Sequence, residues 1–238
     1  YLTSVWKPVE EILDLLGDPD ASSEGEGIAD SMQYQREFRG HLPRMKMEER
    51  IATIHEDFKK VGKDLDREEA LKYFDAIREY TREGYKDIRR AQLAELRGEP
   101  IEDAHLKEQI ALIDEYIASA PLYPKDVPLY RGFGSRSIEN LQAFEDAYVN
   151  GKTISMFGIS SWTSEKEIAF EFLSGKEHVA VFELVSNKTG VSIKHLSAVS
   201  DEEEVLFGTN ATYRIIGKSE VKDIEWGVVT VYKVEEVI

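Results

Sequence analysis

Apolar residues follow a helical spacing in the first half of the chain and a strand-like spacing in the second, with the change near residue 125. In the first half they recur about three or four residues apart, as on one face of an amphipathic helix. Asp66 and Glu69 have the spacing of an N-cap residue and its reciprocal partner, so a helix is expected to open there. The pattern predicts further helices over residues 5–16, 47–61, 84–96 and 103–119, and an acidic linker of small residues at 17–27.

After Pro128 the chain becomes a series of short runs rich in β-branched and aromatic residues, which are typical of strands. Two helices are predicted among them, over Ser137–Tyr148 and Ser164–Leu173, and Ser164 with Glu167 has capping-box spacing. Helices first and strands later favour an α+β fold over a doubly wound parallel sheet. The strand-like runs cover residues 128–133, 153–161, 178–185, 190–193, 204–207, 212–216 and 226–234.

The composition is that of a folded protein with a strongly acidic balance. The 238 residues are 42% hydrophobic, enough to bury a core, and the length fits one domain with an added segment. The 30 Lys and Arg residues against 46 Asp and Glu residues give a net charge of −16. Binding to nucleic-acid phosphates or to anionic lipid depends on surplus positive charge, so the net charge disfavours both as partners. The net charge does not exclude a local basic patch.

Several functional classes are disfavoured by what the sequence lacks. There is no cysteine, and the five histidines share no metal-ligand spacing, so no metal site and no thiolate nucleophile is predicted. The glycines near 132 and 151 lack the spacing of dinucleotide and phosphate loops. No apolar run is long enough to span a membrane and no targeting signal opens the chain. Because the first residue is Tyr1 rather than Met, a piece of a longer protein or a processed chain is expected.

Two short motifs in the strand-rich half carry polar groups at suggestive places. Arg131 ends an apolar run and is followed by Gly132, which suits either a guanidinium aimed at a phosphate or carboxylate, or a structural ion pair. Ser161 and Thr163 point to the same side of an extended backbone, with Trp162 on the opposite side. Their hydroxyls could hold a neighbouring polar group or only cap the helix that follows.

A third motif is the acidic run 201–204, which leads directly into an apolar strand. Such a run is ordinarily a solvated loop, but the abrupt switch to Val205 indicates that the acids sit where a strand enters the core. With a period of two, Glu202 and Glu204 share one face and Glu203 does not. Two carboxylates on one face suit acid–base chemistry or the stabilisation of a developing cation.

In this order the motifs resemble those of the Arg-Ser-Glu class of mono-ADP-ribosyltransferases, which includes bacterial toxins, phage-encoded enzymes and vertebrate arginine-specific enzymes. The matching segments are Tyr130-Arg131-Gly132, Ser161-Trp162-Thr163 in place of the family's Ser-Thr-Ser, Glu202-Glu203-Glu204-Val205-Leu206, and, from the clostridial and insecticidal toxin branch, the helix junction Tyr80–Tyr85. The resemblance implies a catalytic domain over residues 65–238 with a two-sheet mixed β core, preceded by a helical segment over 1–64.

The resemblance implies an enzyme that splits NAD, its substrate, between nicotinamide and ribose and passes ADP-ribose to a protein side chain. Glu204 is then the essential carboxylate, which stabilises the oxocarbenium-like charge as it develops. Glu202 is expected to position or deprotonate the acceptor. Because a glutamate at that second place usually accompanies arginine acceptors in the family, an arginine is expected here.

Other matched positions are expected to bind NAD. Arg131 would hold its phosphates, Gly132 would offer backbone to the nicotinamide amide, and Ser161, in one motif with Thr163, would orient the catalytic glutamate. Phe172 matches the aromatic residue that packs against nicotinamide.

The helix junction is expected to complete the NAD site. Tyr80 and Tyr85 would close the adenosine side, although packing at a helix junction would explain both equally. Arg89 stands where the toxin branch commonly has an asparagine that touches NAD, and it could take over a phosphate contact or face solvent. Trp162 replaces a small residue of the family motif and is expected in the core.

Two other interpretations stay open, a NAD glycohydrolase that uses water as the acceptor and a catalytically silent NAD-binding module. A nucleic-acid acceptor is opposed by the net charge. The toxin-like resemblance further implies an effector that is secreted or injected and acts in the cytoplasm of a target cell, or a virion-associated protein. The target protein itself is not named by the sequence.

Overall fold

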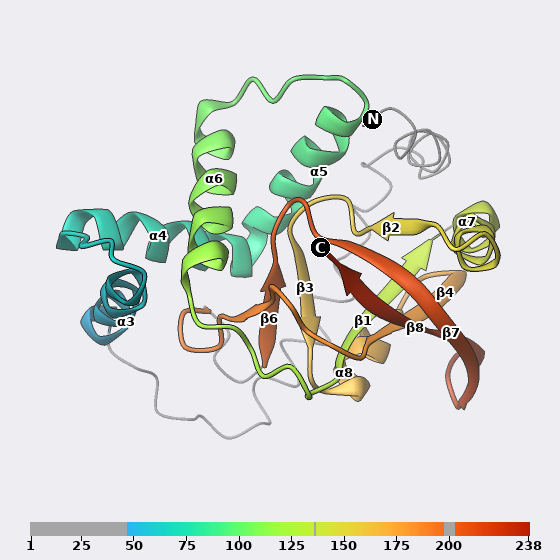
Figure 1. Cartoon of the computed structure of the whole chain (residues 1–238). Coiled ribbons are helices and arrows are strands. Elements are labelled where there is room, and N and C mark those ends of the chain that lie inside the picture. The colour runs from blue at the N-terminus through green and yellow to red at the C-terminus, as the bar shows by residue number, and fades with distance from the viewer. Residues whose placement is uncertain (1–46, 136, 198–202) are drawn as a thin grey trace.

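The computed structural model of the chain describes residues 47–135, 137–197 and 203–238. The helix expected over 5–16 and the linker at 17–27 lie outside these residues. Within the described ranges the helical layer comes first and the sheet follows, as Figure 1 shows, which confirms the α+β class. None of the helices in these ranges is long and apolar enough to cross a membrane.

The helical layer consists of α3 (Met47–Lys60), α4 (Arg67–Glu79), the π-helical segment η2 (Tyr80–Gly84), α5 (Tyr85–Leu96) and α6 (Ala104–Ser119). The expected capping box opens α4, because Asp66 accepts from the Glu69 backbone N–H at 2.8 Å and Glu69 accepts from the Asp66 N–H at 2.9 Å. Helix α4 continues through η2 into α5, so the helix expected from Gly84 starts as a π turn, a feature that recurs at functional sites.

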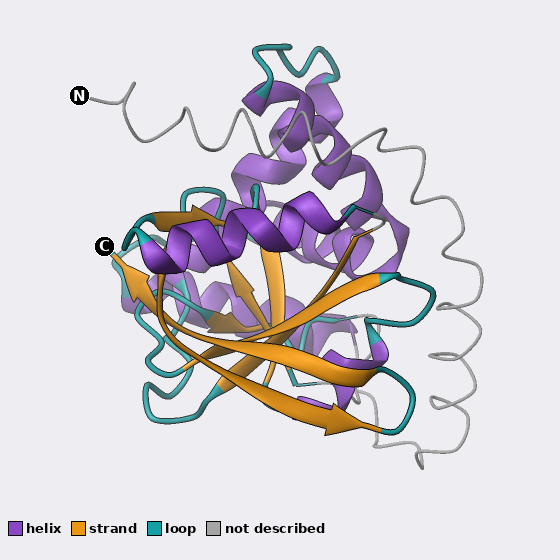
Figure 2. Ribbon diagram, turned by 90° about the vertical axis from the view of Figure 1, so that its right-hand side faces the viewer, coloured by secondary structure: helices purple, strands orange, loops and turns teal. Residues whose placement is uncertain are grey.

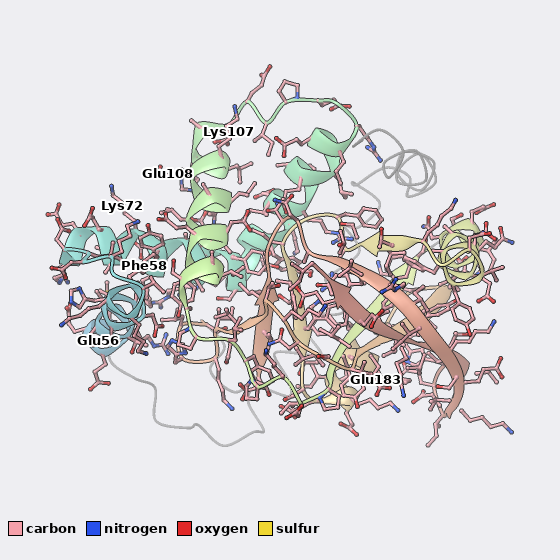
Figure 3. The ribbon with its side chains drawn as sticks, in the orientation of Figure 1. Glu56, Phe58, Lys72, Lys107, Glu108 and Glu183 are labelled. Atoms are coloured by element: carbon pink, nitrogen blue, oxygen red, sulfur yellow. The ribbon has the colours of Figure 1, made fainter. Side chains whose placement is uncertain are left out.

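Helix α3 packs against α4 and α6 with the face that its apolar spacing predicts. Phe58 points to the side of α3 that faces α4, whereas Glu56 lies on the opposite side (Figure 3). Ile54 and Phe58 are fully buried in the same core as residues of α4 and α6. The division of the chain at residues 64 and 65 stays a prediction.

All strands of the described chain form one 8-stranded mixed sheet, in the order β2-β7-β8-β4-β1-β3-β6-β5, with β4 and β8 parallel. The two-sheet core that was expected is therefore corrected to a single sheet. The reason is the strand at its centre: β1 pairs with β4 along its whole length and with β3 through the pair Tyr130–Thr163, so it joins the two groups of strands. The strands are β1 (Leu129–Ser135), β2 (Thr153–Ser155), β3 (Ser160–Thr163), β4 (His178–Leu184), β5 (Val191–Ser192), β6 (Glu204–Phe207), β7 (Thr212–Asp223) and β8 (Gly227–Val237).

Three buried cores hold the layers together. Helix α7 (Ile138–Val149) lies across the sheet (Figure 2) and covers Phe182 of β4, while the next residue back, Val181, faces α8 (Lys166–Glu171) on the other side. The helices α3, α4 and α6 cover the β6–β5 end of the sheet, where Leu206 and Val191 enter their core. The face of β6 that carries Leu206 therefore looks toward the helical layer.

Two local predictions differ from the structure. The run 153–161 is two strands rather than one, because Phe157 (φ 62°) and Gly158 (φ 114°) turn the backbone through the left-handed region between them. The capping box at Ser164 is wrong, since α8 has Glu165 as its N-cap residue and the Thr163 hydroxyl oxygen accepts from the Glu165 N–H at 3.1 Å.

Candidate active site

Glu204 and Ser161 meet on the face of the sheet that looks toward the helical layer. Strands β3 and β6 are antiparallel neighbours in which Thr163 stands opposite Glu204 and Ser161 opposite Leu206. Strand alternation sends Trp162 to the other face, where it is 2% exposed in the core, as predicted. On the near face the Ser161 hydroxyl donates to Glu204 Oε1 at 2.6 Å, a short charge-assisted bond that orients the carboxylate.

Tyr80, the first residue of η2, extends this chain of hydrogen bonds. Its side chain is 5% exposed and its hydroxyl oxygen lies 3.4 Å from Ser161 Oγ. Because Ser161 gives its own hydrogen to Glu204, the Tyr80 hydroxyl is the donor in this contact. Burial and the nearby charge of Glu204 raise the pKa of Tyr80 to about 12, so the phenol keeps its hydrogen at neutral pH.

Arg131 in β1 binds the same serine through its backbone. Its Nη1 donates to the Ser161 carbonyl oxygen at 2.6 Å. Burial lowers the pKa of Arg131, and electrostatic interactions with Tyr80, Tyr213 and Glu204 act in the opposite direction. The guanidinium stays charged at neutral pH. Its hydrogen bond links β1 to β3 at Ser161, the residue that binds Glu204.

A second guanidinium lies close to the first. Arg89 of α5 is half-buried and its Nη1 donates to the Met156 carbonyl oxygen at 3.4 Å. Burial, and after it the positive charge of Arg131, lower the pKa of Arg89 to about 10. The repulsion between two such positive charges falls when an anion binds near both. The structure places the half-buried Arg89 side chain near Arg131, and its contact with a phosphate of NAD stays a prediction.

Gly132 is required by packing against α8. A Cβ built there would lie 2.2 Å from the Ala169 carbonyl oxygen and 3.1 Å from Phe172 Cβ, both in the segment that follows the serine motif. Thr163 is 7% exposed, and its hydroxyl is used in the turn that precedes α8. These two residues therefore fix where α8 sits relative to the Ser-Glu pair.

Two aromatic rings expected to contact NAD are exposed. Phe172, at the end of α8, is 41% exposed, and Tyr85, at the start of α5, is 44% exposed. The Tyr85 ring meets Tyr80 edge-on, with ring centroids 6.5 Å apart. Exposed aromatic rings of this kind can stack against a planar ligand.

A buried glutamine that sequence reasoning missed ties the helical layer to both strands of the site. Gln92 of α5 is 3% exposed; its Oε1 accepts from the Ile159 N–H at 3.0 Å, and its Nε2 donates to Thr209 Oγ1 at 2.8 Å. Asp114 of α6 completes the network by accepting from the Thr209 N–H and hydroxyl at 2.8 and 2.6 Å. Gln92 stands four residues after Ile88 on the apolar face of its helix, and this polar residue at a core position was the available signal.

Only one of the two predicted carboxylates is placed, since Glu202 lies outside the described residues. Glu203, between the two, accepts from the Ser192 hydroxyl at 3.1 Å and from Lys194 Nζ at 2.8 Å, so its contacts are on β5 and the residues just after it and differ from those of Glu204. Among the residues that the structure describes, no group of three or more His, Cys, Asp or Glu side chains could hold a metal ion.

The helical layer, the single mixed sheet and their order along the chain are the fold of bacterial ADP-ribosyltransferases. The Vis ADP-ribosyltransferase of Vibrio splendidus, solved with agmatine, has a TM-score of 0.56 at 22% identity over 83% of this chain and 88% of that one. Plx2a of Paenibacillus larvae has a TM-score of 0.56 at 16% identity over 82% and 98% of the two chains. An ADP-ribosyltransferase of Clostridium botulinum has a TM-score of 0.51 at 19% identity over 82% and 99% of the two chains.

The chain belongs to the ADP-ribosyltransferase exoenzyme family, whose model matches residues 55–236. It is accordingly an NAD-dependent transferase, and the family resemblance seen in the sequence is confirmed. No curated protein sequence matches the chain.

Proposed function

We propose that this enzyme transfers ADP-ribose from NAD to an arginine side chain of a protein and releases nicotinamide. The observation that carries the proposal is the chain of hydrogen bonds from Tyr80 to Ser161 to Glu204, with Arg131 bound to the carbonyl of the same serine. The Tyr80 hydroxyl donates to Ser161 and the Ser161 hydroxyl donates to Glu204, so the carboxylate is held in place before substrate binds. A preorganised negative group of this kind stabilises a cation that forms beside it.

In the proposed reaction the bond between the nicotinamide nitrogen and the ribose carbon breaks, and its electron pair leaves with nicotinamide. Positive charge develops on the ribose, and the Glu204 carboxylate offsets it. A nitrogen of the acceptor then bonds to the same carbon and gives up a proton. Glu202 receives that proton in the proposal, on the strength of its place two residues before Glu204.

The proposed NAD contacts follow from charge and exposure. Arg131 and Arg89, two half-buried guanidiniums that lie near each other, suit the paired phosphates of NAD. Phe172 offers its exposed ring to nicotinamide, next to the backbone of Gly132, and Tyr85 offers its exposed ring to the adenosine side.

Two of the proposed contacts are with residues that also hold the site together. Tyr80 closes the adenosine side beneath the ring of Tyr85, to which it is edge-on. Thr163 lies opposite Glu204 in the strand register and borders the place where the ribose would sit.

Arginine as the acceptor is supported by the glutamate at position 202 and by the Vis structure, because agmatine, which that enzyme binds, carries a guanidinium group. The acceptor protein is proposed to be in a target cell that the enzyme reaches by secretion or injection. Support for this comes from the neighbours described as toxins, Vis and Plx2a. Association with a virion is the other delivery route that fits the family resemblance.

The experiment compares two neighbouring carboxylates. Purified wild-type protein is expected to release nicotinamide from NAD and to label one or a few proteins of a lysate from labelled NAD. Glu204→Gln keeps the size of the side chain and removes the charge, so both rates are expected to fall by at least about 100-fold. Glu203→Gln is the matched control: its carboxylate bonds to Ser192 and Lys194, so nicotinamide release is expected to stay within about twofold, as for a surface change.

Each result has a distinct meaning. Labelling that survives Glu204→Gln would remove Glu204 from its proposed role. Nicotinamide release without labelling of any protein would favour the NAD glycohydrolase, and calorimetric binding of NAD without nicotinamide release would favour the silent binding module. Mass spectrometry of the labelled peptides identifies the acceptor residue, and a modified side chain other than arginine would contradict that part of the proposal.

A further inference from the structure

The segment Ile193–Ser197, which we term the root segment, leads out of β5 and is hydrogen-bonded directly to β6, the strand that begins with Glu204. The Ile193 N–H donates to the Glu204 carbonyl oxygen at 2.9 Å. The Leu196 and Ser197 N–H groups both donate to the Ile193 carbonyl oxygen at 2.8 Å, which folds the segment into a compact turn. Because β5 ends the order of strands in the sheet, a protein that approaches Glu204 from this edge meets the root segment.

A buried chain of polar groups runs from α3 through α6 to this segment. Asp57 of α3 is 4% exposed and its Oδ2 accepts from the hydroxyl of Tyr116, a fully buried residue of α6, at 3.0 Å. The Tyr116 hydroxyl oxygen lies 3.5 Å from His195 Nε2. Since the single hydroxyl hydrogen goes to Asp57, the histidine must be the donor, which assigns the hydrogen to Nε2.

The imidazole of His195 depends on this contact because its surroundings are open on one side. A cavity of about 400 Å³ lies beside it, with Leu122, Tyr123 and Val191 among the lining residues. Burial lowers the pKa of His195, so at neutral pH the ring is uncharged and holds its place by hydrogen bonding rather than by charge. A second tie from α3 supports the far end of the segment, where Arg50 Nη1 donates to the Ser197 carbonyl oxygen at 3.3 Å.

We propose that Asp57, Tyr116 and His195 are positioning residues that hold the root segment against α3 and α6 and thereby set the preference of the enzyme for a protein acceptor over water. The inference rests on the proposed function. Glu204 is held for NAD cleavage by Ser161 and Tyr80, which belong to other elements. Water needs no surface to dock on, whereas a protein does, so loosening the root segment lowers transfer and leaves hydrolysis of NAD largely intact.

The test is the variant Tyr116→Phe, which removes one hydroxyl and keeps the buried ring. Its matched control is Tyr73→Phe, because Tyr73 is also a buried tyrosine of the helical layer and donates to a carboxylate, Glu115, at 2.7 Å, away from the root segment. The measured quantity is the ratio of protein labelling in a lysate to nicotinamide release without acceptor. Tyr116→Phe is expected to lower this ratio by about three- to tenfold, the effect of one lost hydrogen bond, and Tyr73→Phe to leave it unchanged.

Amide hydrogen exchange measures how firmly the root segment is held, and it does not depend on which acceptor the enzyme uses. The amides of Leu196 and Ser197 are expected to exchange faster in Tyr116→Phe than in Tyr73→Phe, while amides of β1 and β4 exchange alike in both. Equal exchange at the root segment in the two variants, or a ratio that falls equally in both, would overturn the proposal. If Tyr116→Phe does not fold, the variant His195→Asn gives the same comparison, because His195 is the half-buried last member of the Asp57–Tyr116–His195 series of hydrogen bonds. A wild-type protein without nicotinamide release refutes the proposed function, and the exchange result still decides the positioning role.

Discussion

At the scale of single residues, Gly132 shows how one pattern can serve two purposes. In the sequence, a glycine after Arg131 is interpreted as open backbone for a ligand. In the structure the position of its missing side chain is filled by the Ala169 carbonyl oxygen, so α8 can pack on β1 only because residue 132 has no Cβ. The packing requirement acts whether or not a ligand is bound, and it holds Phe172 close to Gly132.

Replacement of this glycine is expected to destabilise the protein strongly. In Gly132→Ala the new methyl group would lie 2.2 Å from a backbone atom, so α8 or β1 must move, at a cost of about 1–3 kcal/mol or more in the free energy of unfolding. Gly217→Ala is the control, because there the nearest atom would be at 3.8 Å and the change should be no more than about 1 kcal/mol. Urea denaturation measures both, and equal stability of the two variants would contradict this account of Gly132.

At the scale of elements, the site depends on how α5 is fastened to two strands that are far apart in the sequence. Gln92 bonds to the residue before β3 and to a residue just after β6, so a single side chain spaces the strand of Ser161 relative to the strand of Glu204. The same helix carries Arg89. A change in this junction should therefore affect stability and catalysis together.

Loss of the Gln92 amide is expected to cost more than loss of a comparable buried amide elsewhere. Gln92→Met leaves the buried Ile159 N–H without its acceptor, so the free energy of unfolding should fall by about 1–3 kcal/mol, and nicotinamide release should fall with it. Gln109→Met should cost less, because Gln109 Oε1 finds no partner among the described residues and its Nε2 makes one long bond of 3.4 Å. Thermal unfolding and nicotinamide release measure the two effects; a costlier Gln109→Met would refute the bridging role.

At the scale of the whole molecule, the net charge of −16 acts on whatever approaches the enzyme. A negative field attracts a positively charged acceptor surface, such as one around the proposed acceptor arginine, and speeds its encounter with the enzyme. The same field opposes NAD, which is itself an anion, and the proposed contacts of Arg89 and Arg131 with its phosphates would offset that repulsion locally. The two substrates are thus expected to respond to salt in opposite directions.

Salt is expected to lower protein transfer more than hydrolysis of NAD. The screening length is about 10 Å at 0.1 M salt and about 3 Å at 1 M, so raising the concentration removes long-range attraction to the acceptor. Labelling of lysate proteins should fall as salt rises, whereas nicotinamide release without acceptor should change little or increase. Equal loss of both activities would show that the net charge does not steer the acceptor.

Local patterns in the sequence were sufficient for much of the fold. The capping box at Asp66, the helical faces of α3 and α6, and the burial of Trp162 follow from spacing and strand alternation alone, because they depend on neighbours within a few residues. The order of the Arg, Ser and Glu motifs was likewise sufficient to indicate the family, to which the chain belongs.

Tertiary structure decided what depends on contacts between distant segments. The sequence could not show that β1 joins the strands into one sheet, since a single pair with Thr163 makes that link. Nor could it reveal the hydrogen-bond partners of Gln92, Asp57 and Tyr116, which belong to none of the matched motifs. Period and composition report which side of an element is buried, whereas the partner of a buried polar group is fixed only when helices and sheet pack together.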